Sequence, residues 1–105
     1  MIHIPGSMYS VGEVRNAVEE WDALKERIDT NRYGLRHMVR RLDIHRAYCN
    51  ALSDKQREVI LMHGMAGIGQ DTVAVMLGID QANVHRRYMR GLRAMVSYLN
   101  GGTTE

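Results

Sequence analysis

The spacing of helix-start signals and apolar residues constrains the fold of this chain more than any other feature. Ser10 and Glu13 fit a capping box, in which each side chain bonds a free backbone amide at the start of a helix, and Ser53 and Gln56 repeat the pattern. Apolar residues then recur every three or four positions, which is the period of a helix face. The sole proline, Pro5, interrupts none of these segments. We therefore predict an all-α fold.

Length and composition limit the class of protein. A chain of 105 residues has room for one compact domain and a small appendage, and is too short for a barrel enzyme of ~250 residues. A content of 45% hydrophobic and 25% charged residues is typical of globular proteins. No internal disulfide can form, because Cys49 is the only cysteine. No apolar run reaches the ~18 residues of a membrane span, and the N-terminus lacks a signal-peptide pattern. We predict a cytoplasmic protein.

The N-terminal part is expected to be a lead-in over 1–10 and an antiparallel helical hairpin over 11–50. The apolar stripe of the first hairpin helix comprises Val11, Val14, Val18, Trp21, Leu24 and Ile28. That of the second comprises Leu35, Met38, Val39, Leu42, Cys49 and Leu52. Three roles are open for the hairpin: packing on the C-terminal helices, dimerisation, or docking on another protein. Trp21 is expected at the centre of whichever contact the hairpin makes.

Residues 70–89 meet the steric needs of a helix-turn-helix. The small Ala74 permits a close helix crossing, and Gly78 tolerates the positive φ of a tight turn. Ile79 fills the interior of the turn, and Val84 packs the second helix on the first. The sequence therefore predicts two helices that cross at a steep angle.

This motif lies within a predicted three-helix domain over 51–99, followed by a frayed tail over 100–105. Its elements are a helix from Ser53 to about Gly64, a short helix over 70–77, and a last helix capped by Asp80 that ends near Leu99. The last helix is expected to bury Val84, Tyr88, Leu92, Met95 and Leu99.

The N-terminal end of the last helix carries side chains suited to DNA. Gln81 and Asn83 can pair with adenine edges, and Arg86 can pair with guanine. Four further side chains suit phosphates: His85, Arg87, Arg90 and Arg93. The net charge of +2 conceals a contrast, because residues 13–29 hold six acidic against three basic residues, whereas residues 81–99 hold no acidic residue.

A further set of residues follows the order and spacing of a known family pattern. It comprises Leu52, Ser53, Arg57, Glu58, Val59, Leu77, Gly78, Ile79, Val84, Arg87, Arg90, Gly91 and Leu92. With these residues the segment 52–95 resembles region 4 of sigma-70-type bacterial sigma factors, as do some small phage-borne regulators. The resemblance implies a helix-turn-helix that reads promoter DNA and grips the flap of the polymerase β subunit. Gly69, Thr72 and Val75 depart from the family pattern, which has a polar cap and two acidic residues there. The chain is too short for the other regions of a sigma factor.

We therefore expect a non-enzymatic transcription regulator, without a cofactor, that binds double-stranded DNA and acts as an activator or a repressor. RNA polymerase, a sigma factor or a second copy of the chain are further expected partners. The alternative is a protein-interaction module that binds polymerase or a resident sigma factor and redirects or inhibits transcription without reading DNA. The modest net charge is compatible with this alternative, because dedicated DNA-binding proteins are often more basic.

His45 and Cys49 stand four residues apart, a spacing that could place two metal ligands on one helix face. No paired cysteines or histidines supply the other ligands, so we expect no metal. Cys49 is expected to be a small buried apolar group. No nucleophile motif accompanies the pair, so we expect no catalytic residues.

Overall fold

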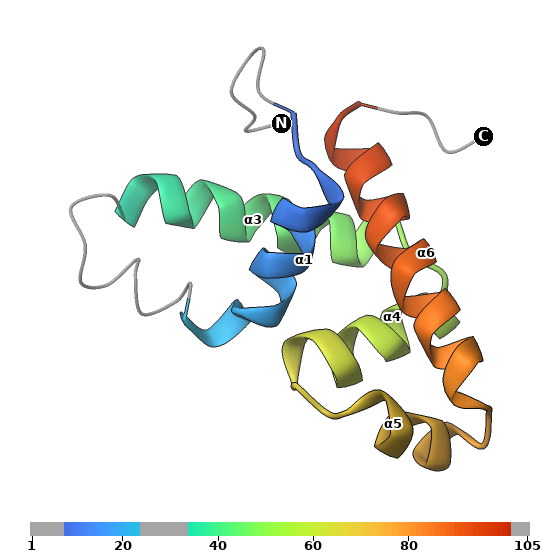
Figure 1. Cartoon of the computed structure of the whole chain (residues 1–105). Helices are drawn as coiled ribbons and strands as arrows, with labels where there is room; N and C mark the ends of the chain where they lie inside the picture. The colour runs from blue at the N-terminus through green and yellow to red at the C-terminus, as the bar shows by residue number, and fades with distance from the viewer. Residues whose placement is uncertain (1–7, 24–33, 102–105) are drawn as a thin grey trace.

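The computed structural model of the chain describes residues 8–23 and 34–101, and the regular secondary structure in these ranges is entirely helical (Figure 1). The helices are α1 (Val11–Glu19), α3 (Gly34–Asn50), α4 (Asp54–Val59), the π-helix η1 (Ile60–Met65), α5 (Gln70–Leu77) and α6 (Gln81–Leu99). The predicted all-α fold is confirmed. No helix in the described ranges is long and apolar enough to cross a membrane.

Both predicted capping boxes are present. The Glu13 amide donates to Ser10 Oγ at 3.1 Å, and the Ser10 amide donates to Glu13 Oε1 at 3.0 Å. At the start of α4, the corresponding distances between Ser53 and Gln56 are 3.2 and 3.0 Å. Each box satisfies amides that have no partner inside the helix, so these two starts are encoded locally.

The core is built around α6, which contacts α1, α3, α4, α5 and η1. Its five predicted inward residues, Val84, Tyr88, Leu92, Met95 and Leu99, are all buried. Residues from every other helix pack with them, among them Val14, Val18, Ile44, Val59, Ile60 and Val73. The last helix thus joins the N-terminal helices to the predicted C-terminal domain in one core.

The first helix is shorter than the predicted stripe. α1 ends at Glu19, because Glu20 leaves the helical conformation at φ −105° and ψ 28°. Leu24 and Ile28 of the predicted stripe lie outside the described residues. Within α1, the buried side chains are Val14, Ala17 and Val18.

The predicted apolar stripe of this segment is wrong at three positions, whereas Leu52 is buried as predicted and the Leu35 side chain lies outside what the structure describes. Met38 and Leu42 are 40% and 43% exposed, and Cys49 is exposed rather than buried. The residues of α3 that face the core are Asp43, Ile44 and Ala47. The helix carries apolar residues on two opposite sides. On the buried side, the small Ala47 side chain lets α3 approach the neighbouring helices closely. Asp43 is tolerated there because the Tyr9 hydroxyl donates to its Oδ2 at 2.8 Å.

Trp21 lies at the edge of the core rather than at its centre. Its side chain is half-buried and packs against the core residues. The guanidinium of Arg41 lies 4.0 Å from the centre of its ring and donates through Nη1 to the Trp21 carbonyl at 2.7 Å. This cation–π contact ties the short helical stretch over 21–23, which follows the turn at Glu20, to α3.

Candidate nucleic-acid interface

The turn between α5 and α6 has the geometry of a helix-turn-helix. Gly78 adopts φ +68° in the left-handed region, and the Ile79 amide donates to the Ala74 carbonyl at 3.1 Å. Ala74 and Val84 are buried where α5 packs on α6, and Ile79 packs against the core. The turn therefore sets the direction in which α6 leaves α5.

The first turn of α6 is organised by side-chain hydrogen bonds. Asp80 Oδ1 accepts from the Asn83 amide at 2.8 Å and caps the helix, as predicted. The guanidinium of Arg86 donates through Nη2 to Asn83 Oδ1. Gln81 is exposed in the same turn. The structure thus brings Asn83 and Arg86 together at the start of the helix, and it leaves Gln81, the third predicted base-reading residue, exposed on another side of that turn.

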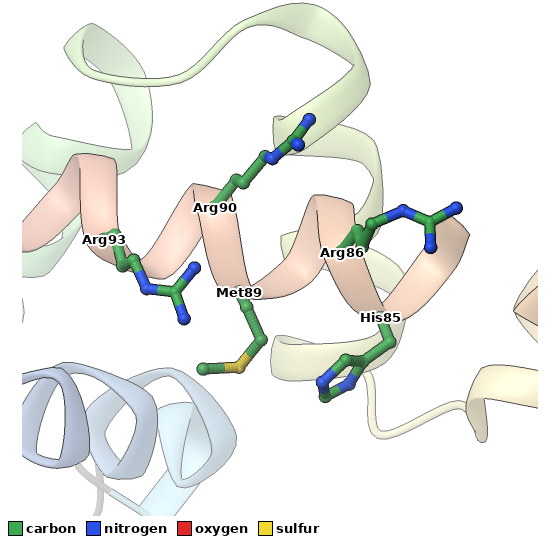
Figure 2. Close-up of a pocket in the computed structure, with 5 residues that line it drawn as sticks. All are labelled: His85, Arg86, Met89, Arg90 and Arg93. Carbon is green, nitrogen blue, oxygen red and sulfur yellow. The ribbon is translucent and has the colours of Figure 1, made fainter. Parts of the chain in front are cut away.

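One exposed face of α6 is strongly basic. It comprises His85, Arg86, Met89, Arg90 and Arg93, which line a shallow hollow of about 290 Å³ (Figure 2). We call this surface the α6 basic face. Figure 2 shows the side chains leaving successive turns of the helix. None of the ion pairs found among the described residues involves them. The face therefore presents unneutralised positive charge to solvent.

The structure divides the residues predicted to contact phosphate. His85, Arg90 and Arg93 share the α6 basic face with Arg86. Arg87 is half-buried and does not line the hollow. Met89 was absent from the prediction, although its position four residues from both His85 and Arg93 places it on the same helix face.

Gln70, at the start of α5, is a second site residue missing from the prediction. Its Nε2 lies 3.3 Å from His85 Nδ1 and 3.4 Å from His63 Nε2. His63 Nδ1 lies 2.7 Å from the Ile68 carbonyl, which can only accept, so this nitrogen carries the proton. The Gln70 side-chain amide then donates to His63 Nε2 and to His85 Nδ1. Gln70 therefore links the His85 ring on α6 to the His63 ring on η1.

No sequence signal identifies this connection. Gln70 and His85 are 15 residues apart and meet only because α5 folds back on α6. His63 also lies edge-on to the Tyr88 ring, at 4.6 Å between ring centres. The polar network therefore joins the basic face to the core of the domain.

Within residues 8–23 and 34–101, no group of three His, Cys, Asp or Glu side chains is arranged to hold a metal ion. Cys49 Sγ lies 3.8 Å from His45 Nε2 on the outer surface of α3. These two side chains do meet, but they bring no third ligand with them.

The comparisons with known proteins identify the domain. Residues 44–95 match the family model of sigma-70, region 4. The match begins within α3 and runs through α4, η1 and α5 into α6, so it contains the whole helix-turn-helix. No curated protein and no solved structure matches the chain. Region 4 domains are non-enzymatic transcription domains that bind DNA and RNA polymerase. Residues 44–95 of the chain therefore form a sigma-70 region 4-like helix-turn-helix domain.

Proposed function

We propose that this protein is a transcription regulator that binds double-stranded DNA by placing α6 in the major groove. The observation that carries the proposal is the α6 basic face, which follows directly on the helix-turn-helix and has no carboxylate partner among the described residues. From Arg86 to Arg93 the helix rises roughly 10 Å, close to the ~12 Å width of the major groove. The face is thus long enough to reach both phosphate walls.

The residues have separate roles in this proposal. Gln81, Asn83 and Arg86 contact base edges, because they lie at the end of the helix that enters the groove. The contact between Asn83 and Arg86 presents an amide and a guanidinium side by side. The residues that contact phosphates are His85, Arg87, Arg90 and Arg93. His85 is held on this face by Gln70, whose Nε2 lies 3.3 Å from its Nδ1. The function is binding and needs neither catalysis nor a cofactor.

The test first selects the DNA sequences that the protein binds from a random pool. It then measures the affinity of the protein for the selected DNA by titration. We expect the double variant Arg86→Ala, Arg90→Ala to bind at least about tenfold more weakly, with a shallower dependence of the affinity on salt concentration. The matched control is Arg36→Ala, Arg46→Ala, which removes the same charge from α3 and should retain the affinity and salt slope of the wild type. Equal losses in both variants would mean that the net charge, and not α6, determines binding. A palindromic selected sequence would indicate that two copies bind together.

A second candidate function is supported by the surface of α5. Val75 and Met76 are 83% and 58% exposed, which is unusual for apolar side chains beside a DNA-binding helix. This patch fits a protein contact, with polymerase or a resident sigma factor as the partner, that redirects or inhibits transcription without DNA reading. Co-purification with polymerase that survives nuclease treatment and Arg86→Ala but is lost in Met76→Glu would favour this function.

A further inference from the structure

The outer face of α3 carries an exposed stripe of three weakly polar or apolar residues and one histidine that points away from the core. Its members follow each other at steps of four, three and four residues: Met38, Leu42, His45 and Cys49. Met38 and Leu42 are 40% and 43% exposed, and the other two side chains are also exposed. The core-facing Ile44 and Ala47 lie on the opposite side of the helix. We call this surface the α3 outer stripe.

The spacing of the α3 outer stripe suits a helical partner. Steps of three and four residues keep side chains aligned along a helix, and the same pattern forms the seam between two packed helices. Among residues 8–23 and 34–101, α3 packs one side against α1 and α6 and leaves the other exposed. The opposite side of this 17-residue helix therefore has room for a second helix along it.

The surroundings of the α3 outer stripe are positively charged. α3 contains four arginines and two histidines, and its single acidic residue, Asp43, is only 1% exposed. Arg40 pairs with Glu13 at 3.6 Å. Arg41 and Arg46 flank the stripe on its two sides by helical position, and neither is in an ion pair found within the described ranges. The Arg41 guanidinium packs on the Trp21 ring and donates to the Trp21 carbonyl, but these contacts leave its positive charge without an acidic partner. An occupant of the stripe therefore meets positive charge on both sides.

The positive charge beside the α3 outer stripe favours one kind of binding partner over another. A second copy of α3 would bring Arg41 and Arg46 against their own counterparts, and like charges at a helix interface weaken association. A helix with acidic flanks would face this positive charge on both sides while its apolar side covers Met38 and Leu42. We propose that the α3 outer stripe is a docking site for an amphipathic helix of a partner protein, with an apolar stripe bordered by Glu or Asp.

Docking at this site is compatible with DNA binding. Figure 1 shows α3 at one end of the molecule, away from α5 and the start of α6. Met38 and Leu42 also lie outside the matched segment 44–95, so half of the stripe belongs to the part of the chain beyond the region 4 domain. The proposal therefore concerns a surface separate from the α6 basic face and does not depend on it.

The test uses three synthetic helical peptides with the same leucine stripe and with flanks of Glu, Gln or Lys. We expect the affinity to fall in that order, with the Glu peptide binding about tenfold or more tightly than the Lys peptide and losing this advantage at high salt. Binding should also protect the Cys49 thiol from alkylation, because Cys49 lies in the stripe. The full-length protein serves for both measurements.

The matched pair of variants is Leu42→Gln and Leu61→Gln, which alter leucines that are 43% and 49% exposed on α3 and η1. Leu42→Gln should weaken binding of the Glu peptide about tenfold, and Leu61→Gln should leave it unchanged. The proposal is overturned if the Glu peptide shows no saturable binding, or if the Lys peptide binds equally well. A concentration-dependent dimer that Leu42→Gln abolishes would also overturn it, in favour of a second copy.

Discussion

Among single residues, Gly64 shows how one missing side chain determines a helix contact. It is buried in η1, where α1 and α6 meet the π-helix. A Cβ atom at this position would lie 2.3 Å from Val18 Cγ1 and 3.2 Å from Tyr88 Cε1. The first distance is far inside van der Waals contact, and the branched Val18 side chain has little freedom to turn away. α1 can therefore pack in this position only because residue 64 is glycine.

We expect Gly64→Ala to lower the free energy of unfolding by about 1–3 kcal/mol, because the added methyl group overpacks a dense core. The control is Gly12→Ala in α1, where a Cβ meets only Ser10 Oγ at 3.8 Å. This change should stabilise the protein by about 0.5 kcal/mol, since alanine has the higher helix propensity. Urea denaturation of both variants tests the pair, and a neutral Gly64→Ala would show that α1 can shift without cost.

At the level of the secondary-structure elements, the turn between α5 and α6 depends on backbone conformation alone. Gly78 has φ +68°, and a Cβ built on it would meet no atom within 4 Å. Any loss of stability on substitution therefore reports the left-handed conformation and not a clash.

We expect Gly78→Ala to destabilise the fold by about 1 kcal/mol, with Gly78→Val costing more and Gly78→Asn costing less. The order follows from the tolerance of each residue for positive φ: asparagine enters this region most easily, and a β-branched side chain least. Thermal denaturation of the three variants gives the ranking. An asparagine variant as unstable as the valine variant would contradict the conformational explanation.

The elements differ in how far the sequence alone predicts them. The capping boxes, the Asp80 cap and the break at Gly78 depend on neighbouring residues, so their positions could be predicted. The π-helical segment could not be, because η1 continues directly from α4 and its bonds, such as Ala66 N to Leu61 O at 2.9 Å, depend on how it packs. Periodicity likewise cannot choose between two apolar sides of α3, since only the contacts with α1 and α6 decide which side is buried.

The same distinction applies to the candidate site. The positions of Arg86, Arg90 and Arg93 on one exposed helix face follow from the 3.6-residue period, which a sequence displays directly. The bond from Gln70 to His85 and the half-buried state of Arg87 depend on how α5 and α6 fold together. Local pattern therefore predicts which side chains are available, and tertiary packing determines their orientation and exposure.

Across the whole molecule, two tyrosines tie the N-terminal part to the rest of the chain. The Tyr9 hydroxyl donates to Asp43 Oδ2 at 2.8 Å, and the Tyr9 backbone exchanges two hydrogen bonds of 2.8 and 2.9 Å with the Asn100 side chain. The Tyr88 hydroxyl donates to Glu19 Oε2 at 2.7 Å. Burial raises the pKa of both hydroxyls above the ordinary tyrosine value, and the hydrogen bonds to the carboxylates raise it further.

These shifts predict a loss of stability at alkaline pH. Unfolded tyrosines release their protons near pH ~10, whereas the folded protein keeps Tyr9 and Tyr88 protonated above that pH. The unfolded state therefore binds fewer protons than the folded state there. The free energy of unfolding should be insensitive to these groups below about pH 10 and should decrease as the pH rises from there toward the folded pKa values. Urea denaturation from about pH 8 to about pH 11 measures this decrease.

The double variant Tyr9→Phe, Tyr88→Phe separates the titration from the packing. Its stability should be lower at every pH, because Asp43 Oδ1 already has no hydrogen-bond partner in the described structure and loss of the Tyr9 hydroxyl leaves Oδ2 unpaired as well. Its decline above pH ~10 should nevertheless be shallower than that of the wild type, since two titrating groups are gone. The control Tyr98→Phe removes a hydroxyl that accepts from Asn50 at 3.4 Å and retains both ties, so it should keep the wild-type decline. If the double variant loses stability as steeply as the wild type, alkaline unfolding begins elsewhere in the molecule.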